Sequence, residues 1–152
     1  MVVGHGHHVL RGMEWYQGKP IMYGLGHFVL DLRWEWSEEL LATIASYEQG
    51  SSVTYTIAPR AGWPLLPMHE DARMTILAWA TASRDGIRDI GFLPCGLTPE
   101  GRVHPLDVGS PEYKKVVSFL EQCIVTQDLK GRIVESGGVC LGGLKTLRVV
   151  PY

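Results

Sequence analysis

The pattern of apolar and polar positions near the start of the chain predicts short strands joined by a tight turn. Met13–Tyr16 and Ile21–Leu25 are rich in strand-forming residues. Four residues with turn chemistry, Gln17-Gly18-Lys19-Pro20, separate them, so the two segments predict a β-hairpin. Val2 and Val3 are typical of the end of a strand, and Phe28–Leu32 of a further extended segment.

Two segments have helical spacing. The first runs from Glu38 to about Glu48, with Ser37 as N-cap, and its apolar stripe consists of Leu40, Leu41, Ile44 and Tyr47. The second opens at Ser110-Pro111-Glu112, which combines a cap, a proline at the first helical position and an acid in the first turn. It should end near Gly131.

The middle of the chain alternates between predicted loops and strands. Ser51–Ile57 alternates like a strand, and the proline-rich stretch Pro59–Pro67 predicts a loop. Arg73–Thr81 and Ile87–Leu93 predict a second hairpin. Apolar residues occupy both faces of Arg73–Thr81, which indicates a central strand covered on both sides.

The remainder predicts a loop at Pro94–Pro105 and one or two closing strands around Val139–Leu141 and Leu144–Val150. The order of strand, helix, strands, helix and strand indicates an α+β fold with a mixed sheet. Neither a repeat nor a linker divides the 152 residues, so a single domain is expected.

Composition and charge narrow the functional classes. The hydrophobic share of 45% suits a chain with a real core, and the net charge of −2 lacks the basic excess typical of nucleic-acid-binding proteins. No apolar stretch approaches the roughly 18 residues of a spanning helix, and no signal-peptide pattern is present. Three widely spaced cysteines indicate reduced, mostly buried thiols and a cytoplasmic chain: Cys95, Cys123 and Cys140.

Other chemistry-bearing residues give weaker signals. The five tryptophans are more typical of packing than of carbohydrate stacking, and His104 is more typical of a surface loop. Glu14 and Glu35 have no paired carboxylate at a readable spacing, so a glycosidase-type pair is unsupported.

The most informative local feature is the cluster of His5, His7 and His8. Imidazoles are frequent ligands for zinc, iron and manganese, and Gly4 and Gly6 allow the backbone to direct two rings at one point. The alternative is an exposed histidine run without a ligand. A stable metal site needs about four ligands, more than this cluster provides.

The segment Val2–Leu32, VVGHGHHVLRGMEWYQGKPIMYGLGHFVLDL, resembles the CapA capsule-synthesis or poly-γ-glutamate-synthesis family, whose members are similar to calcineurin-like metallophosphoesterases. The family pattern is roughly Gly-His-(His or Gly)-Pro-His-Val-Leu, then Gly-Lys-Pro-Ile, then Tyr-Ser-Leu-Gly-Asn-Phe. The matching residues are Gly4, His5, His8, Val9, Leu10, Gly18, Lys19, Pro20, Ile21, Tyr23, Leu25, Gly26 and Phe28.

The chain departs from the family pattern at three positions. His7 stands where the family has proline, Gly24 where it has serine and His27 where it has asparagine. The family pattern selects His5 and His8 as metal ligands, with His7 as a substitute. Metallophosphoesterases at large use Gly-His-x-His, which would select His5 and His7.

The resemblance implies two divalent cations (Mn, Fe or Zn) in a complete domain, which polarise a phosphoryl or acyl oxygen and supply a hydroxide nucleophile. The implied substrate is a phosphoester or an anionic cell-surface polymer. Further ligands lie N-terminal to this motif in the family, so the chain is expected to be the C-terminal portion of a metallophosphoesterase-like β-sandwich flanked by helices, residues 1–152 forming one partial domain. Family members are often anchored at the cell surface.

Contacts with substrate, or with the metal ligands, are expected from His27 and Tyr23 in the Gly-rich motif and from His69 and Glu70 beyond the proline-rich loop. Two functions remain open. One is an incomplete metal-dependent hydrolase that needs an upstream half-domain or a second copy. The other is a non-catalytic interaction domain, or an inactive fragment, of the same fold.

Overall fold

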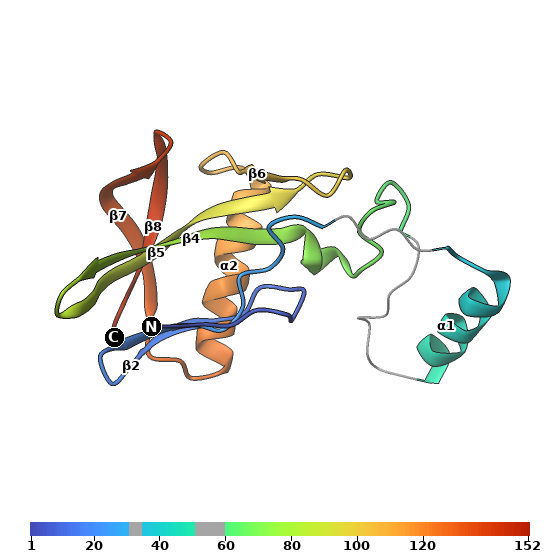
Figure 1. Cartoon of the computed structure of the whole chain (residues 1–152), viewed down its shortest axis with the longest axis horizontal. Helices are drawn as coiled ribbons and strands as arrows, with labels where there is room; N and C mark the ends of the chain where they lie inside the picture. Colours follow the sequence, from blue (N-terminus) through green and yellow to red (C-terminus); the bar gives the residue numbers. More distant parts are fainter. Residues whose placement is uncertain (31–34, 51–59) are drawn as a thin grey trace.

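The computed structural model describes residues 1–30, 35–50 and 60–152, with side chains for 1–30, 35–46 and 60–152. Within these residues two helices accompany two sheets, one of three strands and one of five, which confirms the predicted α+β class. Figure 1 shows the small sheet below the large sheet, with one long helix packed behind them.

The small sheet contains β1 (Val2–Val3), β2 (Met13–Tyr16) and β3 (Lys19–Met22) in the order β1-β3-β2. β2 and β3 form the predicted hairpin, but its loop has only two residues. Gln17 (φ 48°) and Gly18 (φ 69°) both adopt the left-handed conformation, as a tight primed turn requires. β3 therefore begins at Lys19, two residues earlier than predicted.

The large sheet has the strand order β4-β5-β8-β7, with β6 paired to β5. The strands are β4 (Met74–Ser83), β5 (Gly86–Leu97), β6 (Val103–Pro105), β7 (Arg132–Leu141) and β8 (Leu144–Val150). The closing hairpin is thus longer than predicted, since β7 begins well before Val139 and carries an irregularity between Glu135 and Cys140.

The prediction of a loop over Pro94–Pro105 is wrong. β5 continues through Pro94 as far as Leu97, and Pro105 lies in β6 opposite Cys95. A proline lacks an N–H group but keeps its carbonyl, and that of Pro94 accepts a hydrogen bond from the Leu106 N–H at 3.1 Å. Pro94 therefore does not interrupt β5, and Pro105 is the last residue of β6.

The prediction that Arg73–Thr81 is a central strand is also wrong. Among the described strands, β4 lies at the edge of the sheet, and β5 and β8 are the strands with partners on both sides. Ile76 of β4 is buried, whereas the next residue, Leu77, is 38% exposed. Apolar residues on both faces of a strand therefore do not establish that both faces are covered.

Helix α2 (Pro111–Thr126) packs its buried face on the large sheet (Figure 1). Ser110 caps it by accepting a hydrogen bond from the Tyr113 N–H at 3.1 Å, as the sequence predicts. The helix ends at Thr126, earlier than expected, and Asp128 then adopts a left-handed conformation (φ 50°). Its buried residues Val116, Leu120 and Ile124 cover the sheet; the first two belong to the main core cluster.

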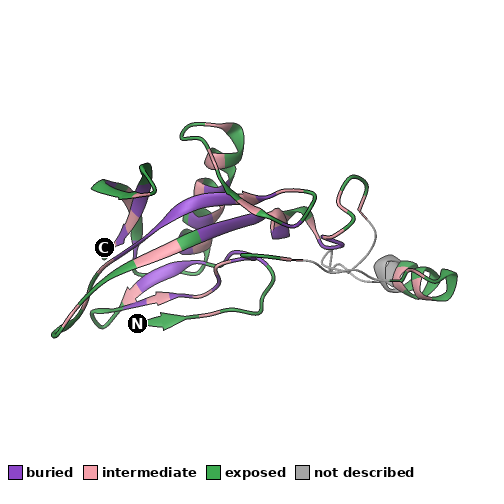
Figure 2. Cartoon of the chain, turned by 45° about the horizontal axis from the view of Figure 1, so that its top comes forward, coloured by how far each residue is buried: buried purple, intermediate pink, exposed green. Residues whose placement is uncertain are grey.

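Helix α1 (Glu38–Gly50) does not bury its apolar stripe. Leu41 is 37% exposed and Ile44 is intermediate, and Figure 2 shows no buried segment on this helix among the residues that it colours. The predicted strand Ser51–Ile57 and the end of Phe28–Leu32 lie outside the described residues. No helix in the described part of the chain is long and apolar enough to cross a membrane.

Buried polar groups join the small sheet to the large one. Glu14 of β2 is only 7% exposed, and its carboxylate accepts hydrogen bonds from the Tyr23 hydroxyl at 2.6 Å and the Lys130 N–H at 3.1 Å. The indole N–H of Trp15 donates to the carbonyl of Val149 in β8 at 2.9 Å. These bonds fix the position of the hairpin relative to β7 and β8.

Replacing Tyr23 by Phe should lower the free energy of unfolding by about 1–2 kcal/mol, because a buried carboxylate oxygen then loses its donor. The same bond raises the pKa of Tyr23 above its ordinary value. Urea denaturation at pH 7 measures the effect. Tyr16→Phe is the matched control, since Tyr16 is 55% exposed in the same strand as Glu14. Equal losses in both variants would contradict a structural role for the Glu14–Tyr23 bond.

Candidate functional site

The histidine motif and the Gly-rich motif meet because β1 and β3 are parallel neighbours. Val2 pairs with Ile21 and Val3 with Met22. Parallel strands end at the same edge of a sheet, so the segments that follow them, residues 4–8 and 23–27, leave the sheet side by side. Two motifs separated in the sequence thereby form one loop cluster.

Two glycines allow close backbone contacts in this loop cluster, one between the two segments and the other against β4. A Cβ at Gly4 would collide with the carbonyl oxygen of Tyr23, and a Cβ at Gly26 would lie 2.7 Å from the carbonyl oxygen of Met74. Gly26 also has φ +79°, a conformation that favours glycine. Gly4 directly precedes His5, and Gly26 directly precedes His27. The close backbone contacts at the two glycines therefore determine where the backbone of both histidines lies.

His27 is held against the edge of the large sheet. The carbonyl of nearby Leu25 accepts hydrogen bonds from the Ile76 N–H at 3.2 Å and from the Thr75 hydroxyl at 3.0 Å. His27 itself is 6% exposed, and its Nε2 atom has no hydrogen-bond partner among the described residues. A buried imidazole nitrogen without a partner is uncommon, and it marks this position as one that a ligand would satisfy.

His8 faces His27 from the other loop. Their ring centroids are 5.0 Å apart and their planes are inclined by 38°. His8 has φ 62°, a left-handed conformation that residues other than glycine seldom adopt. A strained backbone conformation persists only where the surrounding structure holds it in place, and such residues cluster at functional sites.

The environment keeps His27 neutral. Burial, together with the smaller effect of the nearby imidazoles of His8 and His5, lowers its pKa from 6.5 to about 4. A neutral imidazole is the form that binds metal ions, so His27 offers a lone pair without first losing a proton at neutral pH.

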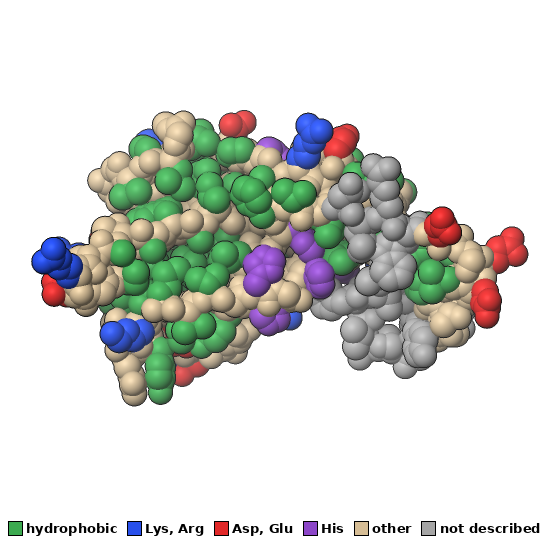
Figure 3. Space-filling view, viewed as in Figure 1, with side chains coloured by type: hydrophobic (Ala, Val, Ile, Leu, Met, Phe, Trp, Pro, Cys, Tyr) green, Lys and Arg blue, Asp and Glu red, His purple; other side chains and the backbone are tan. Residues whose placement is uncertain are grey.

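His7, His8 and His69 line one cavity of about 290 Å³, together with Arg11. Figure 3 shows histidine side chains gathered on one part of the surface. His69 therefore lies at the same cavity as His7 and His8. His69 also caps the short 3₁₀ helix η1 (Glu70–Arg73), because its Nδ1 accepts a hydrogen bond from the Asp71 N–H at 3.2 Å.

The other predicted residues lie elsewhere or are differently engaged. Glu70 lies on the opposite side of η1 and faces Lys115 at 3.8 Å. Tyr23 donates to Glu14. His5 is exposed, and its Nδ1 accepts a hydrogen bond from the Gly6 N–H at 3.0 Å, so this ring would have to reorient before that nitrogen could bind an ion.

The described residues contain no group of three or more His, Cys, Asp or Glu side chains close enough to hold a metal ion. The spacing of the His8 and His27 rings can be compared with that of two imidazoles bound to one ion. Two imidazoles on one tetrahedral ion, with Zn–N distances of about 2.0–2.1 Å, have ring centres roughly 5 Å apart. Their separation of 5.0 Å fits that geometry.

The three cysteines differ in burial and in environment. Burial raises the pKa of the Cys95 and Cys123 thiols, which disfavours the nucleophilic thiolate. Only Cys95 is fully buried, whereas Cys123 is intermediate and Cys140 is exposed, so the prediction of mostly buried thiols is wrong. All three are free.

Residues 1–32 match the family described as Bacterial capsule synthesis protein PGA_cap. The match covers both loops of the histidine cluster, from β1 to the segment after His27. No curated protein matches the chain. The similarity to a capsule synthesis protein is therefore established for the segment that carries His5, His7, His8 and His27, and for that segment alone.

His27 should make the metal-free protein less stable in acid. Its folded-state pKa of about 4 lies below the ordinary 6.5, so the unfolded chain binds the proton more tightly. Its contribution is complete above about pH 6.5 and declines as the pH falls towards 4, by up to about 3 kcal/mol.

Urea denaturation at pH 7.0, 5.5 and 4.5 in the presence of a chelator measures this decline. The His27→Asn variant, which removes the titrating group, should lose less stability over the same range. Parallel pH dependence in the two proteins would show that His27 is not buried as a neutral imidazole.

Proposed function

We propose that the chain is part of a CapA-type protein of capsule or poly-γ-glutamate synthesis and contributes imidazoles to a metal-dependent hydrolase-type site. The observation that carries this proposal is the convergence of His8 and His27 within the segment that matches the capsule synthesis family. The Nε2 of His27, which has no hydrogen-bond partner in the part of the chain that the structure describes, supports a ligand at this position.

His8 and His27 would be the first ligands of the ion. Both are placed by the parallel β1–β3 pair, and their spacing suits one tetrahedral or octahedral cation such as Zn, Mn or Fe. His5 would join them after its ring releases the Gly6 N–H. His7, at the rim of the same cavity, is the substitute ligand. A complete domain would hold two cations, with further ligands from outside this chain.

Bound divalent cations would supply Lewis-acid polarisation of a phosphoryl or acyl oxygen. The chain itself offers two further functions at the cavity. Arg11 is exposed at its wall, where a guanidinium attracts and orients phosphate or carboxylate groups. His69 is held by the cap of η1, so its imidazole is positioned to contact a substrate beside His7 and His8. A phosphoester or an anionic polymer suits this charge arrangement.

A second candidate is a non-catalytic domain that binds another chain through β1. Val2 and Val3 are 57% and 48% exposed, and among the described strands β1 pairs only with β3. An exposed apolar edge strand is a template for a further strand, supplied by an upstream half-domain or a second copy. This function predicts that folding does not depend on metal.

Metal analysis of the purified chain tests the first proposal. The wild type should hold about one equivalent of Mn, Fe or Zn, and the His8→Ala/His27→Ala variant should hold none, because two imidazoles of the ligand set are removed. Elemental analysis measures content and titration calorimetry measures affinity. His5→Ala should weaken binding less, since its ring is engaged with Gly6 before the ion binds.

His104→Ala is the matched control, because His104 lies in β6, outside the histidine cavity. It should bind metal like the wild type. If neither the wild type nor the control binds metal while both unfold cooperatively, the hydrolase proposal fails and the interaction domain remains. Light scattering at two protein concentrations then tests whether β1 joins two copies.

A further inference from the structure

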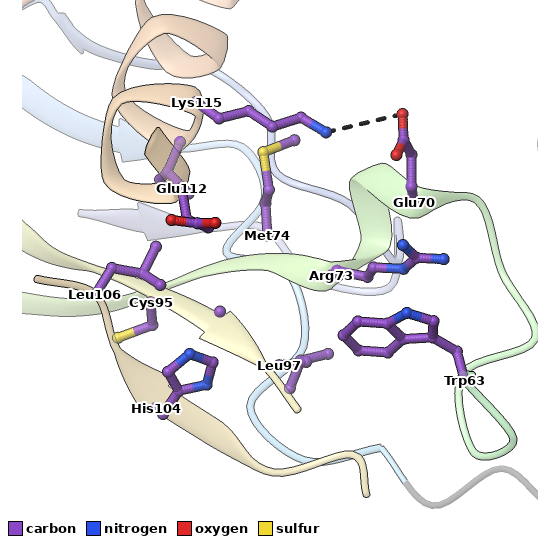
Figure 4. A pocket seen from close by; sticks show the side chains of 12 residues that line it. Trp63, Glu70, Arg73, Met74, Cys95, Leu97, His104, Leu106, Glu112 and Lys115 are labelled. Atoms are coloured by element: carbon purple, nitrogen blue, oxygen red, sulfur yellow. Dashed lines mark ion pairs between the residues drawn. The ribbon is translucent and has the colours of Figure 1, made fainter. Parts of the chain in front are cut away.

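A second cavity, of about 260 Å³, lies on the other side of η1 from the histidines. Four parts of the chain line it: the loop that carries Trp63, η1 with the start of β4, the β5–β6 pair, and the first turns of α2. Figure 4 shows these side chains converging on a common space. None of them belongs to the segment that matches the capsule synthesis family.

One wall carries a positive charge whose donors are not all used. The guanidinium of Arg73 lies over the Trp63 ring, 4.3 Å from its centroid. Stacking on an indole holds the guanidinium plane in place without consuming its N–H groups. The buried Nε of Arg73 has no hydrogen-bond partner among the described residues. The stacked guanidinium therefore places a fixed positive charge on this wall of the cavity.

The opposite wall carries a negative charge. Glu112 projects from the first turn of α2, and Figure 4 shows Met74 between it and Arg73. Glu112 is exposed, and it forms no ion pair with the described residues. The other two charges of the cavity, Lys115 and Glu70, face each other at 3.8 Å across its rim. The charges left for a ligand are thus one cation and one anion on facing walls.

The space between the two charges is apolar. Met74 and Leu97 are buried, and Leu106 and Val116 complete this lining. The Cys95 thiol also borders the cavity, but it donates to the carbonyl of Leu93 at 3.4 Å. An apolar body lying between Glu112 and Arg73 would be removed from water, which favours binding and strengthens the charge contacts at either end.

We propose that this cavity binds a small zwitterion in which an apolar body separates an ammonium group from a carboxylate, the chemistry of a dipeptide with free termini. The ammonium group faces Glu112, and the carboxylate faces Arg73. A purely anionic ligand would pair with Arg73 but be repelled by Glu112. A purely cationic ligand would pair with Glu112 but be repelled by Arg73. The cavity is slightly smaller than the sites of about 300–1,000 Å³ that hold drug-sized ligands, so its volume suits a smaller ligand such as a dipeptide.

Titration calorimetry with alanyl-leucine and its blocked derivatives tests the proposal on the full chain. The free dipeptide should bind best. N-acetyl-alanyl-leucine, which lacks the cation, and alanyl-leucinamide, which lacks the anion, should each bind at least fivefold more weakly. Equal affinity for either blocked form would overturn the zwitterion assignment, and so would an absence of binding by the free dipeptide at millimolar concentration.

Two variants locate the site. Arg73→Met keeps an extended side chain over Trp63 and should raise the Kd about tenfold, with N-acetyl-alanyl-leucine affected alike and alanyl-leucinamide unaffected. Glu112→Gln lies on the surface, so folding should be preserved, and it should raise the Kd about fivefold, chiefly for the ligands with a free amine.

Arg84→Gln and Glu121→Gln are the matched controls, because both residues are exposed and outside the cavity. Unchanged affinity in Arg73→Met and Glu112→Gln would place the dipeptide elsewhere and overturn the proposal. The His8→Ala/His27→Ala variant should bind alanyl-leucine like the wild type. The dipeptide site is therefore tested separately from the metal site, and either can fail without the other.

Discussion

The small sheet keeps its position because polar groups that burial removes from water find their partners in the large sheet. The Glu14 carboxylate, the Trp15 indole and the Leu25 carbonyl each bond across this junction. Leaving any of them unpaired would carry a desolvation penalty, so the two sheets cannot slide past each other without loss. The histidine site depends on this registration, because it forms where the loops of the small sheet meet β4 and η1. The second cavity lies on the other side of η1 and is lined by later parts of the chain.

Local signals in the sequence predicted the parts of the fold that local chemistry decides. The Gln17-Gly18 pair gave the hairpin, and Ser110 with Pro111 gave the start of α2. Where the pairing of strands decides the structure, the predictions were wrong. Pro94 is accommodated inside β5 because β6 supplies a partner for its carbonyl, and β4 is an edge strand although its residues suit a central one. The stripe of α1 indicated burial, but Leu41 remains exposed.

The candidate metal site, like the fold, was predictable only in part from the sequence. Because His5, His7 and His8 are neighbours in the sequence, they lie close together whatever fold the chain adopts. That His27 lies against His8 follows only from the parallel pairing of β1 and β3, and its burial follows from the contact of Leu25 with β4. No pattern in the sequence predicted Arg11 at the cavity or the stacking of Arg73 on Trp63, because both depend on contacts between distant or irregular segments. The departure of His27 from the family pattern was the most useful clue, since it changes the chemistry at a position where the backbone is closely constrained.

The short helix η1 has a consequence beyond the residues that it positions. His69 and Ala72 face the histidine cavity, whereas Glu70 and Arg73 face the other cavity, so one turn of chain is a wall of both. A ligand that displaces this turn on one side changes the shape available on the other. Thermodynamic linkage then requires the effect to be mutual, with each ligand altering the affinity of the other by the same factor. Coupling of this kind would require a ligand that moves η1, the four-residue turn that separates the two cavities.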